Sequence, residues 1–298
     1  MHCAPIALFA YNRPEHLRRT VDSLRANPLA KDSVLYLFCD AARTADHANA
    51  VMAVRSYVHS IDGFHDVRIV EREKNLGLSS SIHQGVASLC DVHGQVIVLE
   101  DDLNLAPSFL EFMNASLAHY ARVDSVMQVS GYQFPGVYGE GSQAVMLPII
   151  SCWGWATWAR AWRHYDHQGK GAELLDQDQM LRKRFNLGGA YDYYGMLQDQ
   201  RAGRIDSWGV RWLLSVFLRE GLVLYPPTTL VQNIGVDGSG THGGGVQDLQ
   251  SNLGDIKSFT WSYPEQIEID GTAFDQVKRL LYAQRPSVFK RILRKLGV

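Results

Sequence analysis

The stretch Val96–Asp102, with the sequence VIVLEDD, decides the fold of this chain. Four apolar residues in succession are typical of a strand buried on both faces in a parallel sheet. Three adjacent carboxylates at the end of such a strand repel one another, so we expect a positive group to bind there. A divalent cation that bridges phosphate oxygens is the natural candidate. The alternative is a solvated acidic turn before a helix that begins near Pro107.

Three similar runs precede this strand, at Ile6–Ala10, Val34–Asp40 and Val67–Val70. Between the runs, apolar residues recur at helical spacing. The resulting β-α-β-α-β-α-β order predicts an α/β fold with a mostly parallel, Rossmann-like central sheet and helices on both faces. The residues that set the helical spacing are Leu17, Val21 and Leu24, then Val51, Val54 and Val58, then Ile82, Val86 and Leu89.

Polar residues follow each of these strands. Asn12 and Arg13 follow the first strand, Asp40 ends the second, and Asn75 follows the third. Because parallel strands end at one edge of a sheet, we expect these groups beside the acidic triplet, where they suit a base, a ribose and a diphosphate. Taken singly, each is also ordinary turn chemistry. The chain lacks GxGxxG after the first strand and lacks GxxxxGK[ST], which argues against dinucleotide and P-loop sites.

These elements together resemble the nucleotide-sugar glycosyltransferases of the GT-A fold. The Glu100-Asp101-Asp102 form is similar to the N-acetylglucosaminyltransferase I type, and the chain also resembles bacterial family 2 glycosyltransferases. The resemblance covers roughly residues 5–245. It implies a metal-dependent, inverting transfer of a sugar, with N-acetylglucosamine as the first guess, from a UDP-sugar to a hydroxyl of a glycan or lipid-linked glycan.

The resemblance also implies roles for single residues. Asp102 would ligate Mn²⁺ or Mg²⁺, which stabilises the charge on the departing diphosphate. Asp40 would recognise the base, and Glu100 and Asp101 would face the ribose or the transferred sugar. The remaining residues expected to line the nucleotide pocket are Asn12, Arg13 and Asn75.

An inverting transfer needs a general base for the acceptor hydroxyl. Asp206 resembles the catalytic aspartate of the family, although Ser207 stands where the family has a second acid. The alternative is that Asp206 is the N-cap of a helix over Trp208–Leu218. A rival alignment relates Arg211-Trp212 to the Arg-Trp pair of processive synthases. The competing carboxylates are Asp192, Asp199 and, more distantly, Asp237.

Aromatic residues suggest an acceptor platform, because indole faces stack on sugar rings. We expect Trp153, Trp155 and Trp208 to contact the sugar or the acceptor, whereas the spacing of Trp158 and Trp162 favours a buried helix face. Six glycines in residues 235–245 indicate a mobile loop, from which His242 could reach the diphosphate or the metal.

Composition limits the other possibilities. The chain has 298 residues, and its 29 basic and 31 acidic side chains give a net charge of −2, which offers no general attraction for nucleic acid. The segment Lys278–Val298 has seven basic residues and no acid, leaving 22 basic and 31 acidic residues in the rest. Apolar residues recur at helical spacing in this segment, which favours either an amphipathic contact with an anionic membrane or a solvated terminal helix.

Four scattered cysteines without CxxC spacing predict a reduced, cytoplasmic protein, with the inner membrane face as a peripheral location. We expect a nucleotide-sugar half at 1–130, an acceptor and catalytic half at 131–263, and a basic tail at 264–298. Two alternative functions remain open at this point: a sugar-phosphate nucleotidyltransferase, and a carbohydrate-binding protein without catalysis.

Overall fold

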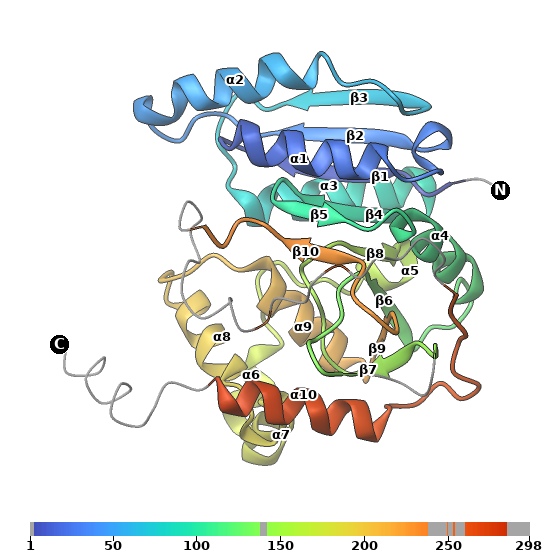
Figure 1. Ribbon diagram of the computed structural model, residues 1–298. Coiled ribbons are helices and arrows are strands. Elements are labelled where there is room, and N and C mark those ends of the chain that lie inside the picture. The colour runs from blue at the N-terminus through green and yellow to red at the C-terminus, as the bar shows by residue number, and fades with distance from the viewer. Residues whose placement is uncertain (1–2, 138–141, 238–248, 250–252, 254–259, 285–298) are drawn as a thin grey trace.

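The computed structural model describes residues 3–137, 142–237, 249, 253 and 260–284. In this part of the chain, eight strands form one mixed sheet in the order β3-β2-β1-β4-β8-β6-β9-β7 (Figure 1). The strands are β1 (Ile6–Ala10), β2 (Val34–Cys39), β3 (Asp66–Glu71), β4 (Gln95–Glu100), β6 (Val126–Ser130), β7 (Val145–Leu147), β8 (Trp155–Trp158) and β9 (Leu222–Tyr225).

The first four strands of this order are parallel, as the sequence predicts. β1 pairs in parallel with both β2 and β4, and β2 pairs in parallel with β3. All five residues of β1 are buried, because helices cover both faces of the sheet at this point. The prediction of a mostly parallel α/β sheet is therefore confirmed.

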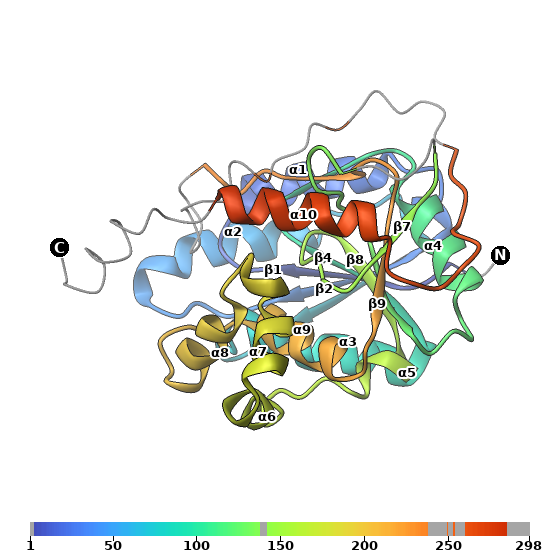
Figure 2. The same cartoon turned by 90° about the horizontal axis from the view of Figure 1, so that it is seen from below.

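Alternate residues of the central strands enter two different cores. Leu8 packs in one core with residues of α1 (Pro14–Arg25), α2 (Ala48–Val58) and α4 (Phe109–His119). Phe9 packs in the other core with residues of α3 (Leu78–His93), α5 (Ala159–Trp162) and α9 (Trp208–Leu218). Figure 2 shows these two helix layers on opposite sides of the sheet. The helices expected from apolar spacing in residues 14–93 are all present.

The second part of the chain continues the same sheet. β8 lies antiparallel between β4 and β6, and β9 pairs with β6 and β7. A third core joins β7 and β9 to the remaining helices. Those helices are α6 (Ala172–Gln177), α7 (Gln179–Phe185), α8 (Tyr193–Arg201) and α10 (Gly271–Ala283).

A short antiparallel ribbon stands apart from the large sheet. It pairs β5 (Leu103–Leu105), which directly follows the acidic triplet, with β10 (Val231–Asn233). The ribbon therefore brings the chain after residue 233 to the carboxyl end of β4. None of the described helices is both long and apolar enough to span a membrane.

Candidate functional site

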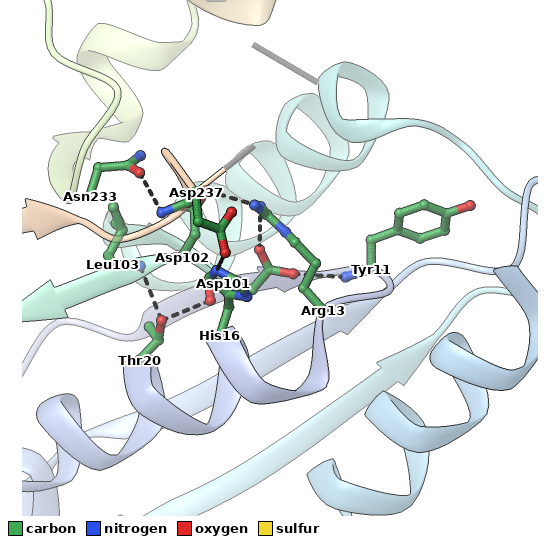
Figure 3. Close-up of polar contacts among 10 residues, drawn as sticks. Tyr11, Arg13, His16, Thr20, Asp101, Asp102, Leu103, Asn233 and Asp237 are labelled. Atoms are coloured by element: carbon green, nitrogen blue, oxygen red, sulfur yellow. Dashed lines mark hydrogen bonds and ion pairs between the residues drawn. The ribbon is translucent and has the colours of Figure 1, made fainter. Parts of the chain in front are cut away.

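The acidic turn after β4 holds a cation supplied by the protein itself. The Nη2 atom of Arg13 lies 2.9 Å from Asp101 Oδ1 and 2.9 Å from Asp102 Oδ2 (Figure 3). Both aspartates are buried, with 4% and 8% of their surface exposed. Arg13 follows β1, which pairs directly with β4, so the sheet register brings the guanidinium to the carboxylates. The sequence predicted a positive group here but not that Arg13 would provide it.

The backbone of this turn is fixed from helix α1. The Thr20 hydroxyl donates to the Asp101 carbonyl oxygen at 2.8 Å and accepts from the Leu103 amide at 3.1 Å. The Tyr11 amide donates to Asp101 Oδ2 at 3.2 Å. Sequence reasoning missed Thr20, because its only signal was a polar residue on the buried face of a helix.

Crowding of the carboxylates shifts their proton affinity. Burial raises the pKa of Glu100 to about 8, and the charges of Asp102 and Asp101 add to the rise, whereas Arg13 and a hydrogen bond from Trp208 oppose it. Burial also raises the pKa of Asp101 to about 6, against the opposing charge of Arg13. Burial lowers the pKa of Arg13, but the two aspartates outweigh it and raise that pKa overall. The site therefore favours additional positive charge.

Two buried atoms of this ion pair have no hydrogen-bond partner among the described residues. They are Oδ1 of Asp102, an acceptor, and Nη1 of Arg13, a donor. Leaving such atoms unsatisfied is costly, so each is open to a further partner. A cation would satisfy the first atom, and an anion would satisfy the second.

Residues 234–237, which follow β10, cover this ion pair. The Ile234 amide donates to the Asp102 carbonyl oxygen at 2.7 Å, and His16 Nε2 lies 3.1 Å from Asp237 Oδ2. A Cβ atom added to Gly235 would lie 2.8 Å from Arg13 Nη1 and closer still to Asp102 Oδ2. Asp237, the least favoured of the competing carboxylates in the sequence, therefore lies beside the acidic turn (Figure 3). The sequence did not predict a role for His16, and it indicated Gly235 only as part of a glycine-rich segment.

Asp40 and Asn75 shape the neighbouring loop. Oxygens of Asp40 accept from the Leu76 amide at 2.9 Å and the Gly77 amide at 2.9 Å, and the Asn75 amide group donates to the Ala41 carbonyl oxygen at 2.7 Å. These bonds join the carboxyl end of β2 to the start of α3. Asn12 is half-buried in the turn between β1 and α1.

Asp206 lies beside this loop and does not cap helix α9. The hydroxyl of Ser207, not the carboxylate of Asp206, accepts from the Val210 amide and caps α9. A Cβ atom on Gly77 would lie 3.9 Å from Asp206 Oδ2, and the Asp206 side chain is 58% exposed. Its Oδ1 accepts a hydrogen bond from Arg211 at 2.6 Å.

The other carboxylates considered for the base have local partners. Asp192 caps α8 by accepting from the Gly195 amide at 3.0 Å. Asp199 pairs with Arg204 at 2.5 Å. Asp206 also has a partner, Arg211, but it is the candidate that lies beside the loop that Asp40 organises.

Two of the three tryptophans expected to contact the sugar or the acceptor are buried. Trp155 is fully buried and stacks on Trp208, which is 3% exposed, with ring centroids 5.0 Å apart. The expected sugar contact does not agree with this burial, because β8 lies inside the sheet and α9 covers it. Trp153 is half-buried against Tyr132. Trp158 and Trp162 are buried, as their spacing predicted, although only Trp162 lies in a helix.

Two other predictions lie outside the described residues. They are the role of His242 and residues 285–298 of the basic tail, whose described part includes α10.

The residues of the acidic turn fit a divalent cation only in part. The described part of the chain contains no group of three or more His, Cys, Asp or Glu side chains able to hold a metal ion. Within the acidic turn, Asp102 Oδ1 is the buried oxygen that has no partner among the described residues. That is compatible with Mg²⁺ or Mn²⁺ bound through one carboxylate, with substrate phosphates and water as the other ligands.

Comparison with solved structures finds weak resemblances. The mannosyltransferase PcManGT from Pyrobaculum calidifontis, in complex with GDP-Man and Mn²⁺, is 12% identical over 74% of each chain, with a TM-score of 0.37. The galactosyltransferase LgtC, with donor and acceptor sugar analogs, is 12% identical over 74% of this chain and 72% of its own, with a TM-score of 0.39. UDP-glucose pyrophosphorylase, complexed with UDP-glucose, is 9% identical over 76% and 91%, with a TM-score of 0.38. Likenesses at this level do not bear on function.

A family model gives the assignment. No curated protein matches the chain. Residues 6–173, more than half of the chain, match the model described as Glycosyl transferase family 2. This range includes β1, β2, β3 and β4 and the acidic turn. The chain therefore belongs to glycosyl transferase family 2 and is a glycosyltransferase.

Proposed function

We propose that this enzyme performs a metal-dependent, inverting transfer of a sugar from a UDP-sugar to a hydroxyl of a glycan or lipid-linked glycan. The observation that carries the proposal is the pair of unsatisfied buried atoms, Asp102 Oδ1 and Arg13 Nη1, on one ion pair. A cation together with a diphosphate satisfies both atoms, whereas either ion alone satisfies only one. N-acetylglucosamine remains our first guess for the sugar, from the resemblance in sequence alone.

The donor side divides between two sets of residues. Asp102 would hold the cation, and Arg13 would hold a diphosphate oxygen while it keeps its ion pair with Asp101. Bound there, the cation would supply electrostatic stabilisation of the leaving diphosphate. Asp40, Asn75 and Asn12 would contact the base, and Glu100 and Asp101 would contact the ribose or the sugar. Burial and the neighbouring carboxylates raise the pKa of Glu100, which favours its protonated form, and that form can donate a hydrogen bond to a hydroxyl group.

Asp206 would remove the proton from the acceptor hydroxyl. The Trp208 side chain, two residues further on, contributes a hydrogen bond to Glu100 at the end of β4, so α9 begins beside the acidic turn. The exposed carboxylate can meet an acceptor from solvent, as a general base requires. Of the three tryptophans predicted to contact the sugar or the acceptor, Trp153 is the half-buried one, so it could offer part of a ring face to that acceptor.

The first experiment measures binding of a panel of nucleotide sugars by calorimetry, with Mn²⁺ and with EDTA. We expect a UDP-sugar to bind only with the metal, and we expect Asp102→Asn to lose at least about tenfold in affinity, because it removes a charge-assisted contact. The matched control is Asp91→Asn, at an exposed aspartate on α3. Full Mn²⁺-dependent binding and turnover by D102N would refute the metal site, and release of pyrophosphate from UTP and a sugar phosphate would instead favour nucleotidyl transfer.

A further inference from the structure

Arg211 is a buried cation whose guanidinium nitrogens are all engaged. It lies one turn into α9 and is 5% exposed. Nε donates to the Ser207 carbonyl oxygen at 3.1 Å, and Nη1 donates to the His167 carbonyl oxygen at 2.7 Å. Nη2 donates to the Ser79 hydroxyl and, at 2.6 Å, to Asp206 Oδ1. These contacts fix the plane of the guanidinium.

Asp206 differs from Arg211 in that its side chain is exposed. The Asp206 carboxylate is 58% exposed, and the helix cap is provided by its neighbour Ser207. An exposed aspartate samples several rotamers unless a partner holds it. Arg211, which is held by three different segments, is that partner.

We propose that Arg211 is a positioning residue that holds Asp206 in the orientation required to take the acceptor proton. The inference rests on the proposed function, because it assumes that Asp206 is the base. Arg211 acts through Asp206 and need not touch either substrate.

The anchors of Arg211 connect Asp206 to the donor side of the site. Ser79 lies in the first turn of α3 and is 1% exposed. Two residues earlier, the amide of Gly77 donates to Asp40 at 2.9 Å. A short run of hydrogen bonds therefore leads from the carboxyl end of β2 through the start of α3 to Arg211 and Asp206. This arrangement fixes the base relative to the loop expected to bind the nucleotide.

Two histidines pack beside this cluster. His83 and His167 stack with ring centroids 4.6 Å apart. Burial lowers the pKa of both, and the charge of Arg211 lowers it further. Neutral imidazoles beside Arg211 leave its ion pair with Asp206 undisturbed at neutral pH.

The test is a double-mutant cycle on sugar transfer with Arg211→Gln, Asp206→Asn and the double variant. We expect R211Q to lower kcat by about 100-fold, the cost of a misplaced catalytic group. The KM for the donor and its Kd in the presence of Mn²⁺ should stay within about twofold, because the acidic turn is intact. The double variant should be no slower than D206N, since Arg211 has no effect once the base is absent. Arg219→Gln, at the exposed far end of α9, is the matched control and should match the wild type.

Each outcome decides between the alternatives. If D206N is inactive and R211Q keeps its kcat, the positioning role is wrong and the base assignment stands. If D206N keeps full activity, the proposed base is wrong and the inference falls with it. If the double variant shows the product of the two single losses, Arg211 acts independently and the inference is wrong. Should R211Q fail to fold, Arg211→Lys takes its place in the cycle, because it keeps the charge but cannot make all four bonds.

Discussion

Gly235 shows how closely the chain after β10 approaches the acidic turn. A Cβ atom there would lie 2.8 Å from Arg13 Nη1 and nearer to Asp102 Oδ2, so even alanine must displace the ion pair or the covering segment. We predict that Gly235→Ala weakens Mn²⁺-dependent binding of the nucleotide sugar at least about tenfold, through misplacement of the two unsatisfied atoms. Calorimetric titration measures this loss.

The control for this prediction is Gly271→Ala at the start of α10. A Cβ atom at Gly271 would meet nothing within 4 Å, so G271A should bind the donor as the wild type does. Unchanged donor affinity in G235A would mean that the segment after β10 moves away from the site when the donor binds.

The stacked pair of His83 and His167 predicts a pH dependence of stability. Burial, aided by Arg211, lowers both pKa values below the ordinary value of about 6.5. Below pH 6.5 the unfolded chain therefore binds protons that the folded chain does not, and the pair's contribution to stability falls as the pH drops through that window. We compare the free energy of unfolding of the wild type with that of the double variant His83→Gln/His167→Gln. The difference, wild type minus variant, should decrease as the pH is lowered from 7.5 to 5.5. Urea unfolding at each pH measures it, and a constant difference would contradict the prediction.

Among the elements, the first four parallel strands and their helices could be predicted from the sequence because the patterns that indicate them are local. β1 occupies Ile6–Ala10 as expected, β2 ends one residue earlier than expected, and β3 is one residue longer at each end. Continuous apolar runs and 3.6-residue spacing depend only on neighbours along the chain. Pro14 stands at the start of α1, where proline is favoured.

The elements after residue 130 were not readable in the same way. β7, β8 and β10 have three or four residues each, and their partners lie far away in sequence. β8 was expected to be part of a tryptophan-rich helix or platform, but Trp155–Trp158 inserts antiparallel between β4 and β6. Strands this short carry too few residues for an alternation pattern, so only pairing in the folded sheet defines them.

The same distinction applies to the site. Residues at the ends of the parallel strands were predictable, because sheet geometry brings those ends together. The covering segment, the pairing of His16 with Asp237 and the clamp of Arg211 on Asp206 depend on tertiary contacts between distant segments. No sequence motif predicts these contacts.

At the scale of the whole molecule, one sheet passes through both of the predicted halves. β4 pairs on one side with β1 and on the other with β8, and Val98 of β4 lies opposite Trp155. The core that contains Phe9 also contains Trp208 and Trp212 from the later half. Removing the later half would therefore expose a long apolar edge at β4, which is unfavourable in water.

We therefore predict that residues 1–130 and 131–263 unfold together in one transition. All seven tryptophans lie between Trp153 and Trp261, so their fluorescence reports on the later half. Cys39 and Cys90 are buried in the earlier half, so their reaction with a thiol reagent reports on that half. Cys3→Ser and Cys152→Ser remove the two partly exposed thiols from the measurement. The two probes should give the same urea midpoint, because neither half keeps its core without the other. A fluorescence transition that is complete while Cys39 and Cys90 remain unreactive would show instead that the nucleotide-sugar half is stable alone.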